Sequence, residues 1–254
     1  MELNYIKSGS GYPIIILHGL FGMLDNWKTI ARSLEEKFTV YLIDQRNHGK
    51  SPHTPEHSYQ LMADDLSVFF THHQIAKAHI IGHSMGGKTA MQFALQHTKK
   101  VNKLIVVDMG IKRYPGGHDS IFDALQSIDL KTIHSRKDAE ILMADKLSDI
   151  TVQQFLLKNL SRNVNGSYRW KFNLEALSAN YDDEILAPVK VLNTFTGDVL
   201  FVRGENSKYI VNEDWDDIQK VFPNAILKTV EDSGHWVHAE QPEAFLGIIL
   251  TFIT

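Results

Sequence analysis

The feature that most constrains this chain is an apolar strand that runs without a break into a glycine-rich turn. Ile80 and Ile81 end the apolar run, and the residues from Gly82 to Gly86 (GHSMG) follow at once. In a G-x-S-x-G turn the serine stands at a sharp junction between a strand and a helix, and the glycines let both elements approach without a Cβ clash. The pattern predicts that Ser84 is an exposed nucleophile. On the alternative interpretation, the glycines only mark a turn.

Short apolar runs alternate with helix-patterned stretches along much of the chain. The predicted buried strands are Pro13–Leu17, Thr39–Ile43, His79–Ile81, Leu104–Val107, Val199–Val202 and Ile226–Val230. The predicted helices are Asn26–Glu36, Tyr59–His72, Met85–Gln96, Trp215–Val221 and Pro242–Ile253. This alternation is typical of an α/β fold with a mostly parallel sheet and helices on both faces. The first run, Glu2–Lys7, is expected to pair antiparallel at the edge through the turn at Ser8–Gly11.

The alternation stops between Ile111 and Pro188. That region has polar helical patterns without a convincing strand, at Ser120–Ile128, Ser135–Leu147 and Thr151–Leu160. We therefore expect residues 1–110 and 189–254 to form the α/β core and residues 111–188 to form a small helical cap. Open parallel sheets bind their ligands at the carboxyl ends of the strands. Polar residues directly after a strand are therefore the candidates for chemistry.

Composition narrows the classes of protein and of ligand. The chain has 254 residues, of which 43% are hydrophobic and 22% charged, enough for one globular domain with an insertion. The net charge of -4 and the absence of a basic block exclude nucleic acid as an expected partner. The chain has no cysteine and no metal-ligand spacing among its 13 histidines, so we expect no metal and no other cofactor. His53, His57, His72 and His73 are interpreted as solvated surface residues.

The first residues, Met1–Lys7, lack the basic start and the long apolar run of a signal peptide. No apolar run is long enough to cross a bilayer. These features predict a soluble, cytoplasmic protein with no membrane partner, and no pattern indicates an oligomeric state.

A serine hydroxyl is a poor nucleophile, so Ser84 needs a base. His235 lies in the run Gly234–His238 (GHWVH) after the last predicted strand. In chains with this kind of G-x-S-x-G turn, the histidine base follows the serine and lies near the C-terminal end, and His235 has that position. Imidazole titrates near neutral pH, so it can take the serine proton and return it to the leaving group. We predict that His235 is the base. His238 lies further along and is predicted to be a structural hydrogen-bonding residue.

The acid that orients the histidine has two candidates. In most members of this kind of fold it follows the strand before the histidine strand, but here Ser207 occupies that position and Glu205 lies too early in the turn. Asp108 directly follows the strand Leu104–Val107, beside the strand of the nucleophile. We choose Asp108, with Glu205 as the alternative. Ser207 either donates a hydrogen bond within the histidine–acid network or only shapes the turn.

Two backbone N–H groups are needed to stabilise the oxyanion of an acyl-transfer reaction. Met85 supplies one at a helix N-terminus, where the dipole favours negative charge. The loop His18–Gly22 supplies the other, with Leu20 the best candidate and Phe21 behind it. Donors of this kind are worth about 3 kcal/mol each.

A further polar turn, Asp44–Gly49, also follows a strand. A turn rich in Asp, Asn and Gly commonly hydrogen-bonds its own backbone, so we interpret it as scaffold. Large aromatic residues are candidates for an acyl pocket facing the serine: Phe21, Phe155, Trp170 and Trp236. The alternative for each of them is simple core packing.

The motifs together resemble the α/β-hydrolase superfamily, and more narrowly the bacterial YbfF-type esterases. The strings that carry this resemblance run in order along nearly the whole chain: His18–Trp27 (HGLFGMLDNW), Asp44–Pro52 (DQRNHGKSP), Ile81–Lys88 (IGHSMGGK), Gln154–Leu160 (QFLLKNL), Arg169–Asn173 (RWKFN) and Gly234–Glu240 (GHWVHAE). Asn47 stands where the broader superfamily usually has glycine, which is a narrow marker.

The resemblance implies a capped acyl-ester hydrolase that prefers short to medium acyl groups, with acyl-CoA thioesters as further candidates. It also implies an acid at Asp108 with Ser207 beside the histidine. We expect a serine carboxylesterase that forms an acyl-serine intermediate on a small-molecule ester or thioester. Two alternatives stay open, a carbon–carbon hydrolase or lyase of the same fold and a non-catalytic ligand receptor that has kept the elbow.

Overall fold

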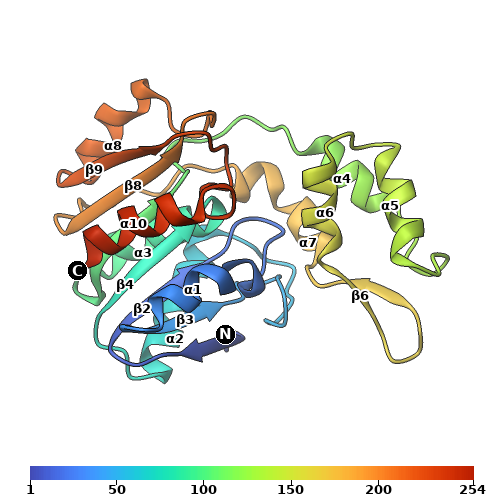
Figure 1. Cartoon of the computed structure of the whole chain (residues 1–254), viewed down its shortest axis with the longest axis horizontal. Helices are drawn as coiled ribbons and strands as arrows, with labels where there is room; N and C mark the ends of the chain where they lie inside the picture. The colour runs from blue at the N-terminus through green and yellow to red at the C-terminus, as the bar shows by residue number, and fades with distance from the viewer.

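The computed structural model describes all 254 residues and has a seven-stranded sheet at its centre (Figure 1). The strands are β1 (Tyr5–Ser8), β2 (Tyr12–Leu17), β3 (Phe38–Ile43), β4 (Ala78–His83), β5 (Val101–Val107), β8 (Asp198–Gly204) and β9 (Ala225–Val230). They lie in the order β1-β3-β2-β4-β5-β8-β9, and every neighbouring pair is parallel except β1 with β3. The predicted α/β fold with a mostly parallel sheet is confirmed.

The edge strand β1 differs from expectation in its partner. It is antiparallel, as predicted, but it pairs with β3 through Tyr5 opposite Ile43 and Ser8 opposite Val40, and not with the strand that follows the glycine turn. The reason is that β2 already has parallel partners on both sides, β3 and β4. The only free edge on that side of the sheet is the outer edge of β3.

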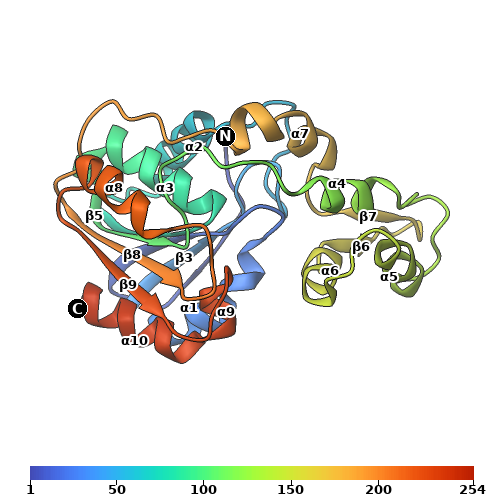
Figure 2. The same cartoon turned by 90° about the horizontal axis from the view of Figure 1, so that it is seen from above.

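Helices cover both faces of the sheet, as Figure 2 shows. One face is covered by α2 (Tyr59–His72), α3 (Met85–Gln96) and α8 (Trp215–Val221), and the other by η1 (Leu24–Trp27), α1 (Lys28–Leu34) and α10 (Pro242–Ile253). Short turns of helix complete this part of the chain: η2 (Thr98–Lys100), η4 (Asn212–Asp214) and α9 (Val237–Glu240). Phe93 and Ile218 are fully buried under the first face, and Phe245 and Ile249 under the second.

Local sequence signals set several helix ends. The Ser58 side chain caps α2 by accepting a hydrogen bond from the Leu61 N–H at 3.3 Å. Pro242 occupies the first turn of α10, where its missing N–H costs nothing. The observed bounds of α2, α3, α8 and α10 are those predicted from the sequence.

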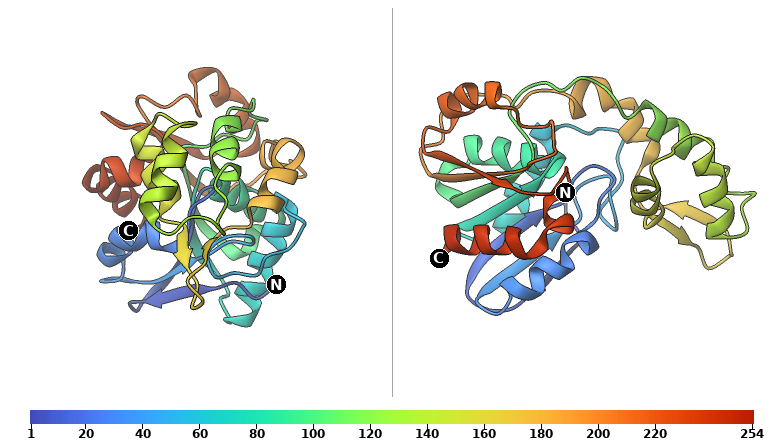
Figure 3. Two further views of the ribbon diagram at one scale, coloured as in Figure 1. Left: turned by 90° about the vertical axis from the view of Figure 1, so that its right-hand side faces the viewer. Right: turned by 45° about the horizontal axis from the view of Figure 1, so that its top comes forward.

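Between β5 and β8 the chain leaves the sheet and forms a lobe at one side of the molecule (Figures 1 and 3). Its elements are α4 (Asp119–Gln126), α5 (Arg136–Ala144), α6 (Ile150–Leu157), β6 (Leu160–Arg162), β7 (Tyr168–Trp170), α7 (Leu174–Ala179) and the π turn η3 (Tyr181–Ile185). The antiparallel pair β6–β7 corrects the expectation that no strand occurs here. Strands of three residues are too short to produce an alternating pattern in the sequence.

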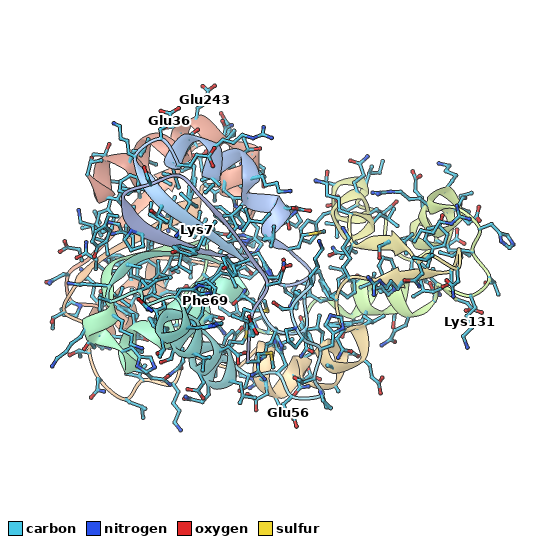
Figure 4. All side chains as sticks on the ribbon, turned by 90° about the horizontal axis from the view of Figure 1, so that it is seen from below. Lys7, Glu36, Glu56, Phe69, Lys131 and Glu243 are labelled. Atoms are coloured by element: carbon cyan, nitrogen blue, oxygen red, sulfur yellow. The ribbon has the colours of Figure 1, made fainter.

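We call residues 111–188 the cap, with the bounds predicted from the sequence. The cap has its own apolar cluster of 18 buried residues, to which the sheet part contributes Phe21. Trp170 and Leu156 are among its members. In Figure 4, Lys131 lies at the far end of this lobe, well away from Lys7 and Phe69 in the sheet part.

One surface expectation is wrong. His57 is only 2% exposed, and its Nδ1 lies 3.4 Å from the Asn47 side-chain nitrogen. Burial, followed by the nearby Arg46 charge, lowers the pKa of His57 to about 3, so the ring is neutral at physiological pH. His53 and His72 are exposed as predicted.

Candidate active site

Ser84 sits at the junction of β4 and α3 in a strained backbone conformation, with φ 52° and ψ −119°. Such a conformation costs a non-glycine residue on the order of 1–3 kcal/mol. Backbone hydrogen bonds hold it: the Ser84 N–H donates to Val107 O at 3.0 Å, and the Lys88 N–H donates to Ser84 O at 3.1 Å. The Ser84 hydroxyl makes no hydrogen bond within the protein, and the residue borders a cavity.

The two flanking glycines are required by space. A Cβ on Gly82 would lie 2.2 Å from Gly86 O, and a Cβ on Gly86 would lie 2.5 Å from Leu17 O. Both distances are far below a van der Waals contact with a backbone atom that cannot move aside. The glycines therefore let strand β4, helix α3 and strand β2 meet closely at Ser84.

His235 and Asp108 come together over a long sequence separation. Nδ1 of His235 lies 2.7 Å from Oδ2 of Asp108, which directly follows β5 and is fully buried. The Ser207 hydroxyl donates to the same Oδ2, and the Gly204 N–H donates to Oδ1 at 3.3 Å. Glu205, the alternative acid, instead accepts a hydrogen bond from the Asp232 N–H at 3.1 Å.

Burial shifts the pKa values of Asp108 and His235 in opposite directions. It raises the pKa of Asp108, whereas the hydrogen bonds from Ser207 and Gly204 lower it. Burial lowers the pKa of His235 below its usual range, and repulsion from a protonated His118 acts in the same direction. An imidazole with a lowered pKa is neutral at pH 7, which is the form that can accept a proton.

Ser84 and His235 border the same cavity, but no hydrogen bond joins the Ser84 hydroxyl to the imidazole in this structure. Such contacts are commonly long without substrate and tighten in the complex. The His235 backbone is itself fixed, because the His83 ring donates from Nε2 to His235 O at 2.8 Å. The residue before the serine therefore holds the segment that carries the imidazole.

The backbone around Ser84 offers two free N–H groups. Neither the N–H of Met85 nor that of Leu20 has an acceptor within the protein. The N–H of Phe21, the alternative to Leu20, already donates to Nε2 of His48 at 3.2 Å. This pairing favours Leu20 as the second donor.

The turn at Asp44–Gly49 lies behind the loop that carries Leu20. Oδ1 of Asp44 accepts from the Leu24 N–H at 2.8 Å, and the Gln45 N–H donates to Nε2 of His18 at 3.0 Å. These bonds fix the loop and leave no free catalytic group in the turn, in line with its interpretation as scaffold.

The cavity has a volume of about 550 Å³ and lies between the strand ends and the cap. Phe21, Phe155 and Trp236 border it, as predicted for an acyl pocket. Trp170 does not border it, because its ring stacks on Phe172 at 5.4 Å inside the apolar cluster of the cap.

His238 also departs from its predicted role. It is buried, but it makes no hydrogen bond within the protein and instead stacks on Trp27 with ring centroids 4.0 Å apart. The sequence analysis missed many other residues that border the cavity, among them Lys88, Tyr114 and Tyr209. The only sequence signal for Tyr209 is its position two residues after Ser207.

The structure has no cluster of three or more metal-ligating side chains. None of its helices has both the length and the apolar character that a membrane span requires.

Comparisons with known proteins agree with this fold. A family model described as "alpha/beta hydrolase fold" matches residues 12–242. The match covers most of the chain, and the protein therefore belongs to the α/β-hydrolase family.

Its relatives within that family include esterases. The chain is 36% identical to "Esterase YbfF" of Escherichia coli (strain K12), over 95% of this chain and 92% of that protein. It is 38% identical to "sn-1-specific diacylglycerol lipase ABHD11" of Danio rerio, over 96% of this chain and 79% of that protein. A solved structure titled "Marine microorganism esterase" matches with a TM-score of 0.97 and 43% identity, and 99% of each chain is covered. The predicted resemblance to YbfF-type esterases is confirmed, and the protein is an esterase-type α/β hydrolase.

Proposed function

We propose that the protein is a serine carboxylesterase that hydrolyses small-molecule acyl esters of short to medium chain length. The observation that carries this proposal is the 2.7 Å contact between His235 and Asp108 beside the strained, unpaired Ser84. A nucleophile, a base and two free N–H groups, which acyl transfer requires, border one cavity, and the buried acid contacts the base.

The reaction begins when the Ser84 hydroxyl attacks the ester carbonyl carbon while His235 takes the hydroxyl proton. The tetrahedral intermediate carries its negative charge on the former carbonyl oxygen, where the N–H groups of Met85 and Leu20 stabilise it. The intermediate collapses, the alcohol leaves with the proton from His235, and an acyl-serine remains. A water molecule that loses a proton to His235 then attacks the acyl-serine. The second tetrahedral intermediate collapses, Ser84 leaves with the proton from His235, and the carboxylic acid is released.

Asp108 and Ser207 support the base in this scheme. Asp108 accepts a hydrogen bond from the Nδ1–H group of His235, which fixes the tautomer with a free Nε2 and stabilises the imidazolium. Ser207 donates to the same carboxylate oxygen and favours its charged form.

The shape of the cavity supports the acyl-chain preference. A space of about 550 Å³ bordered by Phe21, Phe155 and Trp236 accommodates an apolar chain of limited length. Relatives are named as an esterase and as a diacylglycerol lipase, so acyl esters are the first substrates to test. An acyl-CoA thioester would pass through the same acyl-serine.

A graded series of p-nitrophenyl esters and acyl-CoAs tests the proposal. We expect kcat/KM to be highest for short to medium acyl esters and to fall for long chains that exceed the cavity. Faster turnover of acyl-CoAs than of esters would reassign the enzyme as a thioesterase. No turnover of any ester by folded protein would contradict the proposal and favour a carbon–carbon hydrolase or a non-catalytic receptor.

A further inference from the structure

The His235 ring has one parallel aromatic neighbour. Tyr209 stacks on it with ring centroids 3.8 Å apart and an interplanar angle of 17°. The other rings near it are inclined: His83 at 4.7 Å and 44°, and Trp236 at 6.1 Å and 57°. The Tyr209 hydroxyl makes no hydrogen bond within the protein. Tyr209 therefore interacts with His235 through the face of its ring.

The position of Tyr209 is fixed on two sides. Its N–H donates to the Ser207 hydroxyl at 3.2 Å, and its carbonyl accepts from the Tyr114 hydroxyl at 2.6 Å. The Tyr114 hydroxyl in turn accepts from the Gly110 N–H at 2.7 Å. Gly110 lies two residues after Asp108, so this one hydroxyl joins the turn of the acid to the turn of Ser207 and Tyr209.

We propose that Tyr209 is a positioning residue that sets the ring plane of His235, and that Tyr114 ties this function to the first residues of the cap. The proposal rests on the proposed esterase function. The single contact with Asp108 fixes Nδ1 of His235 but leaves the ring free to rotate about that contact. A parallel ring at 3.8 Å removes this rotation and keeps Nε2 aimed at the serine side of the cavity.

Proton transfer depends steeply on this aim, because a misplacement of about 1 Å can cost on the order of 100-fold in rate. The stack acts on the base and not on the binding of the acyl chain. Loss of the ring should therefore lower kcat and leave KM nearly unchanged.

The test compares two substitutions at one position. We expect Tyr209→Phe, which keeps the stacked ring, to retain kcat within about twofold, and Tyr209→Leu to lower kcat by roughly 10- to 100-fold with an unchanged KM. Tyr114→Phe removes only the linking hydroxyl and should lower kcat by less than Tyr209→Leu does. Tyr168→Leu removes a half-buried tyrosine of the cap that does not border the cavity, and it should leave kcat unchanged. Where Tyr209→Leu does not fold, Tyr209→Met takes its place with the same expected result.

Wild-type kcat in folded Tyr209→Leu would overturn the proposal, as would an equal loss in Tyr209→Phe, which would assign the effect to the hydroxyl. A rise in KM without a fall in kcat would make Tyr209 a substrate contact instead. Failure of the esterase function is distinguishable, because the wild-type protein itself would then hydrolyse no ester.

Discussion

The strand ends of the sheet and the cap border the same cavity, but different forces shape them. At the strand ends the backbone itself is constrained: Phe21, Ser84 and Asp108 all have positive φ, and Gly82 and Gly86 have no room for a Cβ. In the cap the only residues with positive φ are glycines, Gly117 and Gly166, and the lobe is held by its own apolar cluster. Backbone geometry positions the proposed catalytic residues, whereas side-chain packing positions the cap residues that border the cavity.

This difference predicts which regions of the molecule tolerate substitutions. Backbone strain of about 1–3 kcal/mol per residue persists only where the surrounding structure holds the conformation in place. Adding or removing a single atom at the strand ends should therefore lower stability or activity. The cap should respond to side-chain volume, with graded effects on which acyl group fits. Single substitutions at the strand ends and in the cap test this contrast.

The acid should show the largest effect. We expect Asp108→Asn to lower kcat by about 10⁴-fold, because the amide cannot hold His235 in the required tautomer. The matched control is Glu205→Gln, whose carboxylate contacts the Asp232 N–H and not the histidine. Ester turnover by both variants is the measurement. Full activity in Asp108→Asn together with its loss in Glu205→Gln would show that the acid is Glu205.

The tight turn around Ser84 should not tolerate one additional methyl group at Gly86. We expect Gly86→Ala to lower the free energy of unfolding by at least about 2 kcal/mol and to abolish turnover, because the new Cβ would meet Leu17 O and His18 O. In the cap, Gly116→Ala has only the Leu186 side chain, at 4.0 Å, near the new atom, and stability should be unchanged or slightly higher. Urea unfolding compares the two. Equal stability of Gly86→Ala and Gly116→Ala would contradict the difference between the strand ends and the cap.

Lys88 lies where the two regions join. Its buried ammonium group donates to the carbonyl oxygens of Leu186 and Ala187, on the chain that returns from the cap, and burial followed by the nearby Arg113 charge lowers its pKa to about 7. We expect Lys88→Met to cost about 1–3 kcal/mol of stability, since both carbonyls lose their donor.

The pH dependence of this effect has a definite sign. Between the folded pKa of about 7 and the unfolded value of 10.5 for Lys88, the unfolded chain binds more protons than the folded one. The stability of the wild type relative to Lys88→Met should therefore rise with pH through this window and fall as the pH drops through 7. Urea unfolding at several pH values checks it, with the exposed Lys99→Met as control. A pH-independent difference would rule out this titration.

The cap wall should give the smallest effect. We expect Phe155→Ala to raise KM several-fold for short acyl esters and to shift the preference towards longer chains, with little change in kcat, because a lost apolar contact is worth roughly 1–3 kcal/mol. The exposed Ile141→Ala on the outside of the cap should change neither parameter. A large fall in kcat in Phe155→Ala would mean that the cap takes part in placing the reacting groups.

The same contrast explains what could be predicted from the sequence. The placement of Ser84, Asp108 and His235 near one another is predictable, because each follows an apolar strand and the strand ends of a parallel sheet meet at one edge. Four helices were predicted with their observed bounds, since their apolar periodicity and end signals agree.

Features that depend on long-range packing were not predictable in the same way. Trp170 has the same sequence character as a pocket residue, but the short β6–β7 pair turns it into the cap interior. His57 is buried only because the turn around Arg46 and Asn47 folds over it. The stack of Tyr209 on His235 joins residues 26 positions apart (235 − 209) and has no periodic signature.

Labelling with a fluorophosphonate probe tests the central claim most directly, that Ser84 is an activated nucleophile. We expect rapid labelling of the folded wild-type protein, with the adduct mapped to Ser84 by peptide mass spectrometry, and no labelling of Ser84→Ala. Absence of labelling in folded wild-type protein, or an adduct on another residue with Ser84 unmodified, would contradict it.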